Sequence, residues 1–232
     1  MLEKLQKLIG EAKVLVNEPM ASHTTFRIGG PADYFVMPET VEELRDILAL
    51  CKEEGLPYFI LGNGSNLLVG DKGFRGVVIQ LYKNFDGLSI EGTKVTAKSG
   101  AMLIRVAKEA GKAGLTGLEF ASGIPGTIGG AMVMNAGAYD GEMKQIVENV
   151  EVIDKAGNLR VLSCEEMEFG YRTSILKREP FIVTKTTFKL DKGDKDVIKE
   201  KMDDLAAKRR DKQPLEFPSA GSTFKRPEGH FA

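Results

Sequence analysis

The spacing of apolar and charged residues along this chain predicts several helices. Four stretches carry the pattern, over residues 1–9, 41–54, 101–112 and 194–210, the last of them mainly charged. Thr40 and Glu43 form a capping-box pattern at the start of the second stretch, and Gly55 is a typical terminator at its end. We therefore expect a helix with defined ends between Thr40 and Gly55.

Strands are predicted where apolar residues alternate with polar ones or run together between turn residues. The segments are TFRIGGPADYF (25–35, a turn-rich strand entry), PYFIL (57–61), GVVIQL (76–81), LSIEG (88–92), KVTAKSG (94–100), a hairpin over 147–163 that turns at 155–158, and PFIVTKTTFKL (180–190). Strands and helices mix without the strict alternation of a doubly wound sheet. The pattern therefore favours an α+β fold with two subdomains that meet near residue 80.

Composition excludes few function classes. The chain has 232 residues, of which 42% are apolar and 28% charged, as in an ordinary folded protein of one or two domains. The formal net charge of −1 gives no electrostatic reason to bind nucleic acid or an anionic membrane. No stretch has the roughly 20 apolar residues of a membrane span, and the N-terminus lacks a signal peptide's apolar core.

The cysteines and histidines do not form a recognisable site. Cys51 and Cys164 are far apart in the sequence, which is no disulfide framework and fits a reducing, cytoplasmic compartment. His23 and His230 lack metal-ligand spacing with either cysteine, so no metal site is predicted.

The 26 glycines are unevenly distributed, and one cluster lies between two predicted strands. This first glycine loop, residues 62–66, reads GNGSN and exposes backbone N–H groups that a phosphate can approach. A plain tight turn is the alternative. The third glycine of a dinucleotide-binding Rossmann fingerprint is replaced by Leu67, and no Gly-Lys-Ser/Thr of a P-loop occurs in the chain.

A second glycine loop, residues 122–131, reads SGIPGTIGGA. Pro125 stiffens it, and its propensities favour neither a strand nor a helix. Such a loop is either disordered or wrapped around a ligand, and its apolar neighbours argue against disorder. Together the two loops point to one large ligand that contains a diphosphate and a flat ring system.

The motifs containing these loops are similar to those of a known family. LGNGSNLLVGDKGFRGVVI, GIPGTIGGAMVMNAGAY, TTFRIGGPAD, FGYRTS and PSAGSTFKRP occur in the same order in the UDP-N-acetylenolpyruvoylglucosamine reductase family, which the whole chain resembles. The resemblance implies a two-subdomain FAD-binding fold of the vanillyl-alcohol-oxidase (PCMH) type, in the compact second type of the family. FAD-binding subdomains are then expected over 1–80 and 81–212, and the start of a substrate domain over 213–232.

The resemblance also implies the reaction and the cofactors. It implies an enzyme of peptidoglycan precursor synthesis that reduces UDP-N-acetylglucosamine enolpyruvate to UDP-N-acetylmuramate with NADPH, through non-covalently bound FAD. The implied partners are small molecules, without nucleic acid or membrane. The residues expected to contact FAD are Gly62, Asn63, Gly64, Ser65, Asn66, Ser122, Gly123, Ile124, Pro125, Gly126, Thr127, Gly129, Gly130, Ala131, Asn135 and Gly137.

Two residues match the family's catalytic positions. Arg172 would stabilise the charge that develops on the substrate carboxylate, because a guanidinium stays protonated and binds a carboxylate through two hydrogen bonds. Ser222 would donate the proton. The alternatives are a surface ion pair for Arg172 and a Gly-Ser turn for Ser222.

Four further residues are expected to bind the substrate: Tyr171, Arg209, Lys212 and Arg226. Core packing is the alternative for Tyr171, and a solvated surface charge is the alternative for the three basic residues.

The chain departs from the family pattern at its end. The family has a catalytic glutamate near its C-terminus, beyond the position of Ala232, and Glu228 lies in the wrong motif to replace it. We therefore expect a truncated chain whose turnover is uncertain. Two alternatives to the reductase remain at this stage: an alcohol or hydroxy-acid oxidase of the same superfamily, and a non-catalytic FAD-binding module.

Overall fold

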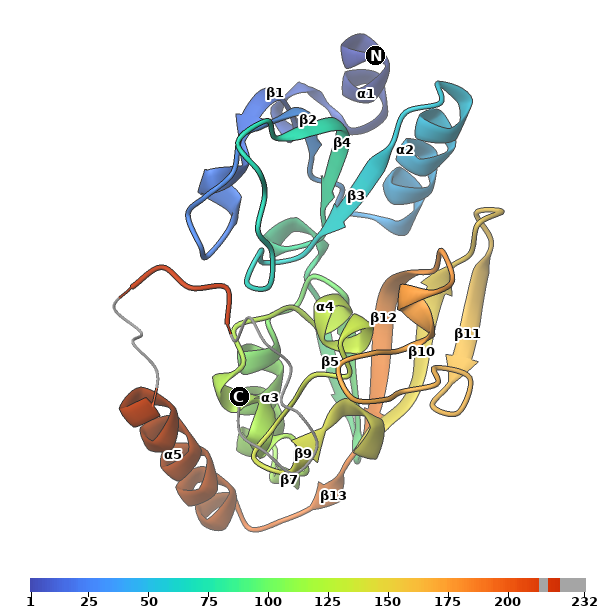
Figure 1. The fold of residues 1–232 in the computed structure, drawn as a ribbon. Helices are drawn as coiled ribbons and strands as arrows, with labels where there is room; N and C mark the ends of the chain where they lie inside the picture. The colour runs from blue at the N-terminus through green and yellow to red at the C-terminus, as the bar shows by residue number, and fades with distance from the viewer. Residues whose placement is uncertain (213–216, 222–232) are drawn as a thin grey trace.

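The computed structural model describes residues 1–212 and 217–221, which form two sheets with helices packed on them (Figure 1). The sheets follow one another along the chain. One contains strands between residues 14 and 80, and the other contains strands between residues 88 and 189.

The first sheet has four strands in the order β1-β2-β4-β3. Its members are β1 (Val14–Pro19), β2 (Pro31–Val36), β3 (Tyr58–Leu61) and β4 (Phe74–Gln80). β1 is antiparallel to β2, whereas β2, β4 and β3 are parallel. Helices α1 (Leu2–Ile9) and α2 (Val41–Glu53) pack on the face that carries Val77 and Ile79. The sequence pattern predicted both helices and three of the strands, but not β1.

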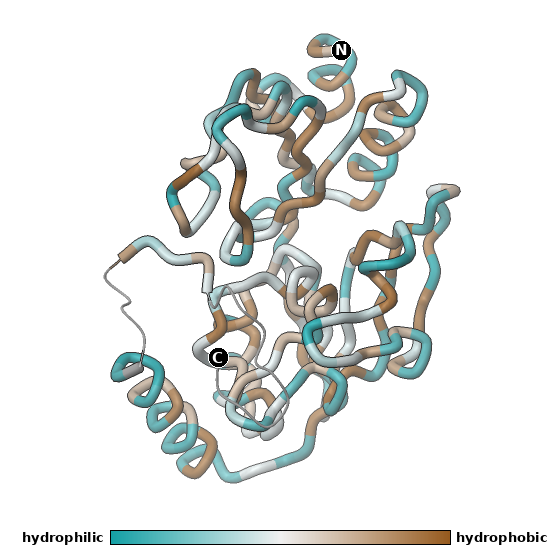
Figure 2. The backbone as a smooth tube through the Cα atoms, viewed as in Figure 1, coloured by the Kyte–Doolittle hydropathy of each residue, from teal (hydrophilic) through white to brown (hydrophobic). Residues whose placement is uncertain are grey.

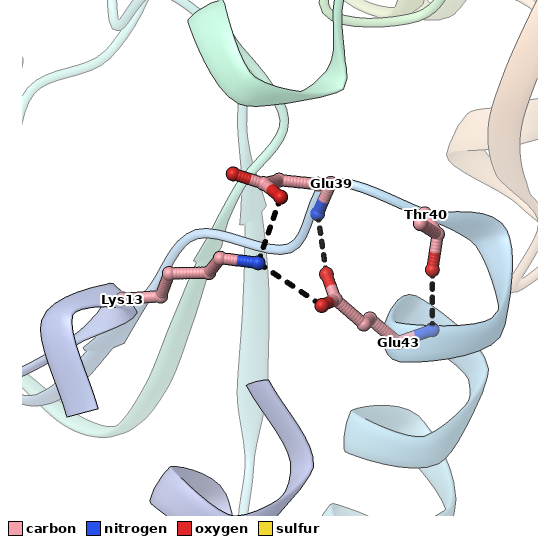
Figure 3. Close-up of polar contacts among 4 residues, drawn as sticks. All are labelled: Lys13, Glu39, Thr40 and Glu43. Carbon is pink, nitrogen blue, oxygen red and sulfur yellow. Dashed lines mark hydrogen bonds and ion pairs between the residues drawn. The ribbon is translucent and has the colours of Figure 1, made fainter. Parts of the chain in front are cut away.

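The predicted cap of α2 is confirmed, with one difference (Figure 3). The Glu43 N–H donates to Thr40 Oγ1 at 3.1 Å. The Glu43 carboxylate accepts from the Glu39 N–H at 2.6 Å rather than from that of Thr40, and it also pairs with Lys13 Nζ at 3.1 Å. The cap therefore ties the start of α2 to the residue that precedes β1.

The second sheet has five antiparallel strands in the order β11-β10-β12-β6-β5. Its members are β5 (Leu88–Glu91), β6 (Lys94–Lys98), β10 (Val147–Ile153), β11 (Leu159–Ser163) and β12 (Ile182–Lys189). The predicted hairpin is the pair β10–β11. Two short pairs accompany the sheet: β7 (Leu115–Thr116) with β13 (Asp191–Lys192), and β8 (Gly137–Ala138) with β9 (Gly141–Glu142).

Three helices accompany the second sheet: α3 (Leu103–Lys112), α4 (Ile128–Val133) and α5 (Lys195–Lys212). Short 3₁₀ helices join the elements, at Glu11–Lys13, Met20–His23, Lys83–Phe85, Glu119–Gly123, Met143–Gln145 and Ile175–Lys177. Figure 2 shows α5 as mainly hydrophilic, and its buried apolar residues are Ile198 and Leu205. The predicted charged helix is therefore confirmed.

The short helix α4 corrects the expectation that the second glycine loop contains no regular element. Thr127 caps this helix, because its Oγ1 accepts from the Gly130 N–H at 3.5 Å. Gly129 lets the helix lie against β6: a Cβ added there would be only 3.1 Å from the Cβ of Ser99. Close packing on the sheet therefore overrides the poor helix propensity of two adjacent glycines.

The two halves of the chain share part of their core. The cluster beneath α1 and α2 includes Leu81 and Phe85, which follow β4, and also Ile153 and Ile182 from the second sheet. All four side chains are at most 7% exposed. The two sheets are therefore joined by apolar packing as well as by the chain.

Candidate functional site

The two glycine loops lie against each other at the junction of the two sheets. Asn63 Nδ2, in the first loop, donates to the Pro125 carbonyl of the second at 2.9 Å. A Cβ added to Gly62 would be 2.4 Å from Thr127 Oγ1. Because real Cβ atoms do not approach other atoms so closely, any larger residue at position 62 would force Thr127 or one of the loops to move.

The first glycine loop also packs against the segment that precedes β2. Gly64 has a φ of +64°, and a Cβ there would be 2.0 Å from the His23 carbonyl oxygen. The Thr25 N–H donates to the Gly64 carbonyl at 3.1 Å. His23 itself is held within the protein, since its Nε2 lies 2.8 Å from Glu18 and its ring stacks on Phe35 at 4.0 Å between centroids. The loop is therefore fixed from both sides.

A cavity of about 440 Å³ opens beside the first glycine loop. This volume is within the range of about 300–1,000 Å³ for ligand pockets. Its lining residues are Ser22, His23, Thr24, Thr25, Asn63, Gln80, Tyr82 and Lys83. Only Asn63 was predicted as a site residue. The others come from residues 22–25, at and just before the TTFRIGG motif, and from residues 80–83, at and just after the end of β4. Sequence proximity to two family motifs is the only signal that could have found them.

The loops fit a flavin dinucleotide on chemical grounds. Ser122 Oγ, in the second loop, is buried and has no hydrogen-bond partner among the described residues. Buried hydroxyls are normally paired, so a bound polar group would supply the missing partner. Gly126, in the same loop, leaves its backbone open to an anion, since a Cβ added there would meet only Ser65 Oγ at 3.8 Å. An unpaired donor beside bare backbone suits a diphosphate with attached polar groups.

Arg172 stands at the tip of a tight turn. The N–H groups of Gly170 and Thr173 each donate to the other residue's carbonyl, at 3.1 and 3.2 Å. Arg172 has a φ of +56°, and its Nη2 donates to the Gly137 carbonyl at 3.0 Å. The guanidinium also lies over the ring of Tyr171, 5.4 Å from the centroid. Tyr171 is 54% exposed, so the core-packing alternative for it is wrong.

Asn135 is 1% exposed, and its carboxamide is bonded within the protein. Nδ2 lies 3.1 Å from the Gly170 carbonyl and 3.0 Å from Glu142 Oε2, while Oδ1 accepts from the Lys144 N–H at 3.0 Å. The structure thus connects the Arg172 turn to the segment that follows the second glycine loop.

Helix α5 contacts the second glycine loop through Arg209. A Cβ on Gly123 would be 3.1 Å from Arg209 Cδ, and burial lowers the pKa of the Arg209 guanidinium. Lys212 is the last residue of α5. Ser222 and Arg226, the other predicted catalytic and substrate residues, lie outside the described residues.

Residues 217–221, which precede Ser222 in the chain, return to the first glycine loop. The Ser219 N–H donates to the Thr25 carbonyl at 3.1 Å, and Thr25 Oγ1 donates to the Ser219 carbonyl at 2.5 Å. Since Thr25 also bonds to Gly64, this segment is joined to the loop through one residue.

Glu119 is a buried carboxylate at the start of the 3₁₀ helix Glu119–Gly123, and sequence reasoning missed it. It is 2% exposed, accepts from Thr116 Oγ1 at 2.5 Å and from the Gly117 N–H at 2.9 Å, and lies 3.8 Å from Lys201 on α5. Burial raises the pKa of this carboxyl, but the hydrogen bonds outweigh burial and the pKa is lowered. Nothing in the apolar, glycine-rich stretch around it marked this glutamate.

The described residues offer neither a metal site nor a membrane-spanning helix. Residues 1–212 and 217–221 contain no group of three or more His, Cys, Asp or Glu side chains able to hold a metal ion. In the same part of the chain, every helix is too short or too polar for a bilayer crossing.

Comparisons with known proteins agree with this geometry. Residues 32–163 match the family described as FAD binding domain. The chain is 52% identical to UDP-N-acetylenolpyruvoylglucosamine reductase of Clostridium botulinum (strain Hall), covering 99% of this chain and 74% of that protein. It is 54% identical to the protein of the same name from Clostridioides difficile (strain 630), covering 98% of this chain and 75% of the relative.

Solved structures show the same relationship. The crystal structure of UDP-N-acetylenolpyruvylglucosamine reductase from Thermus caldophilus superposes with a TM-score of 0.81 at 38% identity, covering 95% of this chain and 76% of that one. p-Cresol methylhydroxylase superposes with a TM-score of 0.61 at 18% identity, covering 83% of this chain and 43% of that one, and so shows the fold alone. The expected fold type is therefore confirmed, and the chain belongs to the UDP-N-acetylenolpyruvoylglucosamine reductase family.

Proposed function

We propose that this chain is an FAD-dependent oxidoreductase that reduces UDP-N-acetylglucosamine enolpyruvate to UDP-N-acetylmuramate with NADPH, in peptidoglycan precursor synthesis. One observation carries the proposal: the Arg172 guanidinium is bonded to Gly137, two residues beyond Asn135 in the segment that follows the second glycine loop. A guanidinium that can bind a carboxylate is thereby held to the segment that follows the second glycine loop, where the dinucleotide is proposed to bind.

The glycine loops are proposed to hold FAD. Residues 62–66 would bind the diphosphate through backbone N–H groups, and residues 122–131 would bind it through Ser122 and bare backbone. Asn135 and Gly137 would contribute only main-chain contacts, because the Asn135 carboxamide is already bonded. When bound, FAD supplies the hydride chemistry that links NADPH to the enolpyruvyl group.

Arg172 is proposed to bind the substrate carboxylate. Negative charge develops on this group when hydride reaches the neighbouring methylene carbon, and a fixed guanidinium stabilises it without rearranging. Its bond to Gly137 uses one of five N–H donors, so the others remain for a two-pronged contact. Tyr171, beneath the guanidinium, would limit where the substrate can lie.

Ser222 is proposed to donate the proton that completes the reduction. It follows Gly221 directly in the sequence, so it continues the segment that Thr25 holds to the first glycine loop. A serine hydroxyl is a weak acid, and a nearby cation or a relaying water must therefore assist it. Arg209, Lys212 and Arg226 are proposed to bind the phosphates or carboxylate of the substrate.

Two broader assignments belong to the same proposal. We place the division between FAD-binding subdomains near residue 80, and the start of the substrate domain at 213. We also place the protein in the cytoplasm, since both cysteines are free thiols in the structure.

The test follows the two halves of the reaction in the purified protein. Visible flavin absorption should be present, NADPH should bleach it without oxygen, and the enolpyruvyl UDP-sugar should restore it. A yellow protein that NADPH bleaches but the sugar never reoxidises would contradict the proposed substrate. An absence of flavin absorption after FAD is supplied would contradict the proposal as a whole.

Variants assign the residue roles. Arg172→Lys keeps the charge but loses the planar fork, so reoxidation by the sugar should slow by about 100-fold or more while bleaching by NADPH is unchanged. Ser222→Ala should likewise slow reoxidation by the sugar and leave bleaching by NADPH unchanged. Arg178→Lys is the matched control, because Arg178 makes an exposed ion pair with Glu168 and should leave both rates unchanged. If Ser222→Ala abolished bleaching instead, the assignment of the proton donor would be wrong.

A further inference from the structure

We propose that Asn135 is a positioning residue for Arg172, and not a side-chain ligand of the cofactor. Its carboxamide joins three segments and holds the turn that presents the guanidinium. This inference rests on the proposed function, because Arg172 must bind the substrate for its position to matter. It extends that proposal by giving the site a residue that acts without touching substrate.

The first argument is that both N–H donors and the oxygen of the Asn135 side chain already have partners within the protein. Its Nδ2 contacts two acceptors, the Gly170 carbonyl at 3.1 Å and Glu142 Oε2 at 3.0 Å, and its Oδ1 accepts from the Lys144 N–H at 3.0 Å. A carboxamide offers two donors and an acceptor on one short side chain, which these three partners require. Aspartate has the same shape but no donor, and it would face the Glu142 carboxylate. The chemistry therefore selects asparagine.

The second argument is that Asn135 donates a hydrogen bond to Gly170, the residue at the base of the turn. Gly170 exchanges two backbone hydrogen bonds with Thr173, and these bonds close the turn around Tyr171 and Arg172. The Gly170 carbonyl that accepts from Thr173 also accepts from Asn135. Fixing that carbonyl fixes the plane of the turn, and with it the direction in which the Arg172 side chain leaves the backbone.

The third argument is that Asn135 and Arg172 link the same two segments of chain at two separate points. Arg172 Nη2 donates to the Gly137 carbonyl, which is two residues after Asn135 in the chain. The turn is thus held at its base by Asn135 and at its tip by the guanidinium. The two hydrogen bonds close a ring that runs through residues 135–137 and 170–172. The ring has few ways to relax, because a shift at either hydrogen bond must distort the other.

The fourth argument is backbone strain in the same ring. Within the ring, positive φ angles occur at Asn135 (40°) and Arg172 (56°), whereas those at Tyr139 and Asp140 belong to the two-residue turn between β8 and β9, which requires them. Non-glycine residues adopt such angles at an energetic cost, and they persist where surrounding contacts impose them, most often at functional sites. The buried carboxamide at the centre of the strained segment supplies contacts of that kind.

The experiment compares two substitutions at Asn135 in the holoenzyme. Asn135→Gly removes the carboxamide but accepts the positive φ, and Asn135→Asp keeps the shape but loses both donors. Each should bind FAD and be bleached by NADPH like the unmodified protein. Reoxidation by the enolpyruvyl sugar should slow by about 100-fold, the loss typical of a 1 Å misplacement, and the Kd of the sugar for the oxidised enzyme should rise.

A double-mutant cycle separates positioning from general structural damage. If Asn135 acts through Arg172, then Asn135→Gly should change the reoxidation rate and the sugar Kd very little in an Arg172→Ala background. Thr40→Ala is the stability control, because it removes the cap of α2 far from this turn; it should lower Tm and leave both half-reactions unchanged. Glu142→Gln, which alters one partner of Asn135, gives a milder test should both Asn135 variants fail to fold.

The outcomes distinguish this inference from the proposed function. If the unmodified protein is not reoxidised by the sugar, the proposed function fails. If it is reoxidised, but the Asn135 and Glu142 variants match it, the positioning role is refuted alone. Equal slowing of bleaching and reoxidation, or effects that multiply in the double variant, would also refute it.

Discussion

The contact between Gly62 and Thr127 gives a sharp test of whether the two glycine loops must touch in order to hold a flavin. Gly62→Ala adds one methyl group at a position 2.4 Å from Thr127 Oγ1, whereas ordinary contact begins at 3.4 Å. Either the loops separate by about 1 Å, or Thr127 rotates and its cap on α4 is lost. Overpacking of this kind typically costs about 1–3 kcal/mol.

That cost converts directly into a ligand affinity. If FAD requires the loops in contact, the binding free energy falls by the same amount, which corresponds to a Kd raised about 5- to 150-fold. The measurement is a titration of the flavin-free protein with FAD, followed by quenching of flavin fluorescence. Thermal unfolding of the flavin-free protein, recorded in parallel, shows how much of the cost falls on stability instead.

Two variants control this experiment. Gly70→Ala lies outside both glycine loops, where the added methyl would meet no atom within 4 Å, so its FAD affinity should stay near that of the unmodified protein. Thr127→Ala in the Gly62→Ala background removes the obstructing atom and should restore much of the affinity. Equal affinities for Gly62→Ala and Gly70→Ala would show that contact between the loops is irrelevant to the cofactor.

Three other predictions test separate parts of the structure. Burial opposes ionisation of Glu43, but its hydrogen bonds and Lys13 outweigh burial and hold the pKa of its carboxyl below the ordinary 4.5. The ionised carboxylate therefore stabilises the folded protein above pH 4.5, and this stabilisation is lost as the pH falls through the pKa of Glu43 in the folded state. Unfolding of Glu43→Gln by urea should therefore depend less on pH across that window than unfolding of the unmodified protein. Burial raises the pKa of Cys51 to about 11, so at pH 8 its thiol should resist alkylation until the protein unfolds, as mass spectrometry of the labelled peptides can show. Thr25→Val removes a hydrogen bond to the Ser219 carbonyl, typically worth about 1 kcal/mol, and hydrogen exchange of the Ser219 N–H should rise about fivefold while Thr25→Ser leaves it unchanged.

Local signals in the sequence predicted most of the regular elements. The Thr40 cap, the stop at Gly55 and the β10–β11 turn each depend on residues a few positions apart, and these elements form as expected. β1 was missed because its VLVNEP sequence is short, ends in proline and is completed only by pairing with β2. Helix α4 was missed because its stability comes from packing on β6 rather than from its own glycines.

The candidate site was less accessible to sequence reasoning than the fold. The sequence motifs predicted both glycine loops and, through the family resemblance, Arg172, but not the contact of Asn63 with Pro125 across more than sixty residues of chain. Asn135 was expected beside the cofactor, and only three-dimensional contacts show that its carboxamide faces the protein. Glu119 gave no signal because the burial of its carboxylate arises only on folding, although its two hydrogen-bond donors, Thr116 Oγ1 and the Gly117 N–H, are three and two residues away.

The position of Ile153 and Ile182 beneath the N-terminal helices has a consequence for how the protein can be dissected. Separating the two halves would expose this apolar surface on both fragments, so we expect neither fragment to fold stably on its own. Heat or urea should melt the molecule in one step rather than two. The spacing of the two glycine loops is in that case set before any cofactor binds, and no hinge motion between the halves is needed to bring them together.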